Sequence, residues 1–99
     1  TSMTTADDAG NLVGPVMRAG EIADAVLEAI QEDNAGREVV AEAHASYVRI
    51  KVADECFVRF ETVGDVLGRT VTRGDIEANM PSFAGFIRTE PDGIRFIAR

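Results

Sequence analysis

The stretch EIADAVLEAIQED, residues 21–33, decides the fold. Its apolar residues recur at helical spacing and form one stripe, while acidic residues line the other side, which predicts an amphipathic helix against a core. The apolar stripe is Ile22, Ala23, Val26, Leu27 and Ile30, and the acidic side is Glu21, Asp24, Glu28 and Glu32. Asn34 and Gly36 should end the helix, because both residue types accept the left-handed conformation.

Strands are predicted on both sides of this helix. Residues 12–17 form a short strand, and because Gly14 and Pro15 interrupt it, we expect an edge strand or a bulge and not a central strand. After the helix, residues 39–41 predict a second strand. Residues 47–52 predict a third, because apolar and polar side chains alternate there with period two.

The second half of the chain repeats this order loosely. Residues 56–61 predict a strand, and residues 83–89 and 94–98 predict two more, joined by the turn sequence at 90–93. Between them, capping-box patterns predict two short helices. These patterns begin at Thr62 with Asp65 and at Thr72 with Asp75, and the helices should end at Gly68 and Pro81.

The predicted fold class is therefore α+β. We expect two βαββ-like halves whose antiparallel sheets pack with one main helix and two short helices. Residues 1–10 are small, polar and acidic and predict a disordered tail, and residues 11–99 predict a single domain.

Charge narrows the possible partners. The formal net charge is −7, with nine acidic and two basic residues in positions 1–45 and eight of each in positions 46–99. Such a field repels phosphates and anionic lipids, so neither nucleic acid nor membrane is an expected partner. The sequence shows neither a signal-peptide pattern nor a run of roughly 18 apolar residues. We therefore expect a cytoplasmic protein, and we expect it to be monomeric when free.

No pattern in the sequence predicts an active site. One cysteine and one histidine cannot supply the usual zinc ligands, so Cys56 is read as a small buried side chain and His44 as a strand or loop residue. The glycines are too dispersed for a phosphate-binding loop. A basic strand face would also be possible, formed by Arg49, Lys51 and Arg59 beside Tyr47 and Phe57.

Three segments resemble the effector proteins of bacterial multicomponent diiron monooxygenases, most closely the four-component toluene, alkene and isoprene branch. They are NLVGPVMRAG (11–20), DNAGRE (33–38) with YVRI (47–50), and SFAG (82–85) with IRF (94–96). The resemblance is loose over residues 53–73, and the tail before residue 11 is shorter than in methane monooxygenase effectors.

This resemblance implies a non-catalytic subunit without cofactor or metal. Such a subunit binds the diiron hydroxylase, tunes its oxygen activation, coupling and substrate or regiospecificity, and competes with the electron-transfer component. The partner-binding residues we expect are Asn11, Val13, Gly14, Pro15, Glu61, Thr62, Asn79, Ser82 and Phe83.

Two alternatives stay open from the sequence. One is a small-molecule-sensing βαββ regulatory domain, which requires a sizeable pocket between sheet and helix. The other is an enzyme that uses His44 with neighbouring carboxylates.

Overall fold

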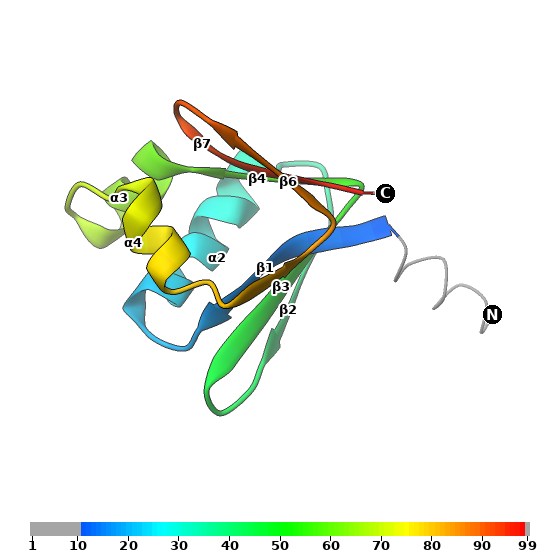
Figure 1. Cartoon of the computed structure of the whole chain (residues 1–99), viewed down its shortest axis with the longest axis horizontal. Helices are drawn as coiled ribbons and strands as arrows, with labels where there is room; N and C mark the ends of the chain where they lie inside the picture. Colours follow the sequence, from blue (N-terminus) through cyan, green and yellow to red (C-terminus); the bar gives the residue numbers. More distant parts are fainter. Residues whose placement is uncertain (1–10, 99) are drawn as a thin grey trace.

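A computed structural model of the chain describes residues 11–98 (Figure 1). The predicted disordered tail, residues 1–10, lies outside the described residues. The described chain is α+β with two antiparallel sheets, in the strand orders β2-β3-β1-β5 and β4-β7-β6. The predicted fold class is thereby confirmed.

The elements follow one another in the predicted order, with one additional short strand. They are β1 (Leu12–Arg18), α2 (Glu21–Asp33), β2 (Val39–Ala43), β3 (Tyr47–Ala53), β4 (Glu55–Arg59), α3 (Phe60–Leu67), α4 (Arg73–Ala78), β5 (Ser82–Ala84), β6 (Phe86–Glu90) and β7 (Gly93–Ile97). The main helix α2 has the predicted bounds.

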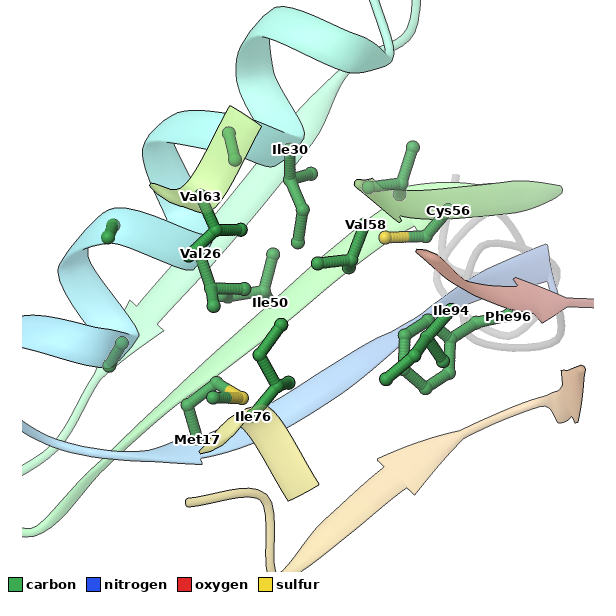
Figure 2. Close-up of a cluster of buried hydrophobic side chains, with 14 of the residues drawn as sticks. Met17, Val26, Ile30, Ile50, Cys56, Val58, Val63, Ile76, Ile94 and Phe96 are labelled. Carbon is green, nitrogen blue, oxygen red and sulfur yellow. The ribbon is translucent and has the colours of Figure 1, made fainter. Parts of the chain in front are cut away.

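Helix α2 lies between the two sheets, which diverge from the end of the molecule near the C-terminus (Figure 1). Its buried side chains, including Val26 and Ile30, meet Ile50 of the four-stranded sheet and Val58 of the three-stranded sheet (Figure 2). Burying this many aliphatic side chains supplies the main stabilising free energy of the fold.

Strand β1 is internal, so the prediction of an edge strand or bulge is wrong. It pairs with β3 on one side and β5 on the other. Its ladder with β3 has pairs at Val13 and Val16 but none at Gly14 or Pro15, with equal numbers of residues on both strands. The ladder therefore opens where proline has no N–H to donate, and the strand continues unbroken.

The predicted strand over residues 83–89 is two strands that belong to different sheets. The chain turns at Gly85, whose φ is 97°, and leaves β5 to enter β6. A Cβ at Gly85 would lie 2.7 Å from the carbonyl oxygen of Ile97 and from Cγ1 of Val13. Only glycine satisfies both the dihedral angle and this close approach.

The start of α3 also differs from the prediction. The preceding strand ends at Arg59, and the helix begins at Phe60 without a side-chain cap. Thr62 lies inside the helix, is buried, and donates its hydroxyl to Oδ1 of Asp33 at 3.1 Å. Its predicted role as a cap is therefore wrong, whereas Gly68 does end the helix in the left-handed conformation.

The second predicted capping box is confirmed. The backbone N–H of Asp75 donates to the Thr72 hydroxyl at 3.2 Å, and the backbone N–H of Thr72 donates to the Asp75 carboxylate at 3.0 Å. The two bonds satisfy donors that the first turn of α4 would otherwise leave unpaired.

Asn34 follows the last residue of α2 and joins the helix to β4. Its Nδ2 donates to the carbonyl oxygens of Ile30, at 2.7 Å, and Phe57, at 3.0 Å. Its Oδ1 accepts from the backbone N–H of Phe57 at 3.0 Å. The side-chain amide thus bonds to both backbone groups of Phe57 as a neighbouring strand would.

Candidate partner-binding surface

Exposed apolar residues lie along the strands β5 and β6, which we call the β5–β6 edge (residues 82–90). The large hydrophobic residues with the most exposed surface are Val66 (37%), Phe83 (40%), Phe86 (60%) and Ile87 (38%). Three of these four lie on the β5–β6 edge, where β5 and β6 are the outermost strands of their sheets. Exposed apolar residues along two edge strands are typical of a protein-binding site.

The core supports this edge from behind. The ring of Phe83 packs against that of Phe96 at a centroid distance of 5.8 Å, and Phe96 is fully buried. Pairing with β1 fixes the backbone of β5. A partner would therefore meet a Phe83 ring that is already held in place, which lowers the entropic cost of binding.

A second surface lies on the side of the four-stranded sheet that faces away from α2, and we call it the outer sheet face. It carries two hollows of about 220 and 270 Å³ that share Val16, Arg49 and Ser82. The other lining residues are Leu12, Gly14, Arg18, Ser46, Tyr47, Ile50, Lys51, Pro81, Phe83 and Ala84.

Gly14 helps to form the floor of the first hollow. Its φ is 152°, and a Cβ there would lie 2.3 Å from the carbonyl oxygen of Ile50. Its neighbour on β5 is the small Ala84. Glycine is therefore required by the packing of β1 against β3, and the absence of a side chain leaves the hollow above it.

Of the nine expected partner-binding residues, four are inside the protein. Val13, Gly14, Pro15 and Thr62 are buried, so in this conformation they support the surface and do not present side chains on it. The exposed members are Asn11, Glu61, Ser82 and Phe83.

Asn79 lies between these groups and is half-buried. Its Nδ2 donates to the carbonyl oxygen of Asp75 at 2.9 Å, and its own carbonyl oxygen accepts from the backbone N–H of Arg18 at 2.8 Å. The structure thus joins Asn79, Ser82 and Phe83 to the opening strand. Glu61 lines a different hollow, of about 580 Å³, beside α3.

The basic strand face considered from the sequence is divided between the two sheets. Arg49, Lys51 and Tyr47 lie on β3, whereas Arg59 and Phe57 lie on β4. The five side chains therefore do not form the continuous platform that stacked bases require.

The titratable groups play structural roles. Burial raises the pKa of the Cys56 thiol to about 12, so this residue is the small buried side chain predicted. A hydrogen bond from Arg95 lowers the pKa of Glu90, and the same bond raises the pKa of Arg95, which also pairs with Glu55. His44 lies in the loop between β2 and β3, stacked on Tyr47 at 4.5 Å.

A metal site and a membrane-spanning helix each have requirements that the described residues do not meet. Within residues 11–98, His, Cys, Asp and Glu side chains do not gather in groups of three or more that could hold a metal ion. Over the same range, every helix is too short or too polar to cross a membrane.

The packing between α2 and the sheets tests the alternative of a small-molecule-sensing domain, which requires a pocket there. The space between α2 and the sheets is occupied by Val26, Ile30 and Ile50, each fully buried (Figure 2). The hollow beside α3 and the two hollows of the outer sheet face open at the surface. The arrangement is thus that of a packed core with outward binding surfaces.

Sequence reasoning missed Phe86, Ile87 and Arg18 as surface residues. Adjacent apolar residues on one strand cannot both face the core, because side chains alternate between the two faces. That rule alone would have placed Phe86 or Ile87 outside. Arg18 was missed because the predicted strand ended one residue too early.

The fold resembles that of known regulatory proteins. Two matched chains come from structures of a phenol hydroxylase–regulatory protein complex, with TM-scores of 0.75 and 0.70 at 20% and 24% identity. They cover 89% and 87% of this chain and 98% of their own length in each case. The soluble methane monooxygenase regulatory protein B matches with a TM-score of 0.67 at 20% identity, over 91% of this chain and 66% of that one.

Comparison with curated protein sequences finds no match. A model of the MmoB/DmpM family, in contrast, matches residues 11–97 and so spans both sheets and all the helices described above. This chain therefore belongs to the MmoB/DmpM family.

Proposed function

We propose that this chain is a cofactor-free effector subunit that binds the diiron hydroxylase of a multicomponent monooxygenase. Membership of the MmoB/DmpM family supports the proposal, as does the likeness in fold to regulatory proteins found with phenol hydroxylase. Within that group we assign the chain to the toluene, alkene and isoprene branch. The subunit is non-catalytic, and it acts in the cytoplasm beside its hydroxylase.

The observation that carries the proposal is the apolar β5–β6 edge. Phe83, Phe86 and Ile87 expose apolar surface along these two edge strands, which a partner would cover. Ser82 and Asn79 flank this apolar surface, and the buried residues of β1 hold it in place. We expect Asn11 and Glu61 to contribute from the two sides.

The bound subunit would act by selecting one hydroxylase conformation. A ligand that binds two conformations equally well shifts neither population. A preference of about 1–3 kcal/mol changes the population ratio roughly 5–150-fold. We propose that this preference speeds oxygen activation, couples electron use to substrate oxidation and sets regiospecificity, and that binding excludes the electron-transfer component from the same hydroxylase surface.

The test measures product formed per electron consumed by the hydroxylase from the same organism, as this chain is titrated in. Wild-type chain should raise the yield until the effect saturates. Phe86→Asp and Ile87→Asp should raise the concentration needed by about tenfold or more, because they place charge in an apolar contact. Val66→Asp, at an exposed apolar residue on α3, is the matched control and should behave as wild type.

Two results would contradict the proposal. One is a yield that does not respond to the wild-type chain. The other is an equal response to wild type and to both edge variants, which would remove the β5–β6 edge as the contact surface.

A further inference from the structure

The outer sheet face has no cover among the described residues. Helix α2 packs on the opposite face of the same sheet, and the two hollows adjoin across Val16, Arg49 and Ser82. Leu12, Val16 and Ala84 supply an apolar lining over the glycine floor. This shape suits a side chain that projects from another protein.

The charge of this face is opposite to that of the whole chain. The chain carries −7, yet Arg18, Arg49 and Lys51 surround the two hollows. Glu42, on β2 opposite Arg49, pairs with Lys51 at 3.3 Å, so three cations and one carboxylate leave a local net of +2.

Arg18 and Arg49 do not form ion pairs with the described carboxylates, although Glu42 lies opposite Arg49 in the sheet. Within residues 11–98, no carboxylate lies within 4.0 Å of the guanidinium groups of Arg18 or Arg49. Arg49 instead lies 5.9 Å from the centroid of the Tyr47 ring. Both arginine residues are exposed, so they remain available to a carboxylate from outside.

We propose that the outer sheet face receives an acidic segment of the hydroxylase, with an apolar side chain of that segment seated over Gly14. The inference rests on the proposed function and adds a second contact in the same complex. The hollow is continuous with the β5–β6 edge through Ser82 and Phe83, so one partner can reach both surfaces. A short acidic segment meets the local +2, whereas a nucleic acid would also meet the −7 of the whole chain.

The experiment measures the affinity of the full chain for purified hydroxylase from the same organism at low and high salt. Arg18→Gln/Arg49→Gln should weaken binding at low salt by about tenfold and flatten its salt dependence. The control Arg69→Gln/Arg73→Gln removes the same charge from exposed positions elsewhere. It should stay within about twofold of wild type, since exposed ion pairs such as Arg69–Glu21 contribute little.

The outcomes separate the two proposals. If the Arg18/Arg49 variant binds as wild type, or no more weakly than the control, the inference is overturned and the proposed function stands. If wild-type chain does not bind the hydroxylase at all, both fail. Melting curves of the two double variants should match wild type, because the four substituted side chains are exposed.

Discussion

Replacing Gly14 with alanine should destabilise the fold more than the same replacement at Gly20, the residue before α2. The new Cβ would lie 2.3 Å from the carbonyl oxygen of Ile50, in a backbone with φ of 152°. Backbone strain in this region costs about 1–3 kcal/mol. Overpacking against β3 costs about another 1–3 kcal/mol. We therefore expect a loss of about 2–6 kcal/mol, against a total stability of about 5–15 kcal/mol for a typical domain.

Replacements at two other glycines allow the backbone strain and the overpacking to be measured separately. Gly20 has a similar φ of 148° with no atom within 4 Å of its Cβ position, so Gly20→Ala should show only the strain of about 1–3 kcal/mol. Gly74 lies in α4 with its nearest neighbour at 3.7 Å, so Gly74→Ala should be neutral or stabilising by about 0.5–1 kcal/mol.

The assay is urea unfolding followed by far-ultraviolet circular dichroism. The midpoint should fall in the order Gly74→Ala, Gly20→Ala, Gly14→Ala, with an unchanged slope. A Gly14→Ala protein as stable as the Gly20→Ala protein would refute the reasoning, because it would show that β3 does not restrict this position.

Three further predictions concern stability. Asn34→Ala should lower the free energy of unfolding by about 2–3 kcal/mol, because it leaves both backbone groups of Phe57 without their partner, and urea unfolding measures the loss. Thr72→Ala should cost about 0.5–2 kcal/mol through loss of the α4 cap, and a thermal melt unchanged from wild type would contradict this. The pKa of Cys56 is raised to about 12 by burial, so the folded state holds its proton longer than the unfolded state does, and stability should fall as pH rises from about 9 towards 12. Cys56→Ala should lack this component of the pH dependence.

Much of the fold could be predicted because its signals are local. The periodic stripe of α2, the alternation in β3 and the Thr72 capping box each depend on residues close in sequence. The misplaced elements depend on distant neighbours. The ladder between β1 and β3 opens at Pro15, and the chain bends at Gly85 because Ile97 and Val13 approach it closely.

The candidate surface was harder to predict for the same reason. Ser82 and Phe83 are predicted as partner-binding residues because they follow Pro81, which ends a predicted helix, and the structure adds Phe86 and Ile87 beside them on an exposed edge. Sheet register alone decides that Arg18 and Arg49 share a face, since they come from different strands. No pattern within one strand carries that information.

The amide of Asn34 has a consequence for how copies of this protein can associate. The amide occupies the backbone hydrogen-bonding positions of Phe57 that an added strand would need. A strand from another molecule could therefore pair with β4 only after the end of α2 had unwound. Strand addition to the three-stranded sheet is thus directed to its opposite border at β6. Aggregation that begins from this sheet should therefore begin at β6, and the proposed contact of the β5–β6 edge with the hydroxylase would suppress it.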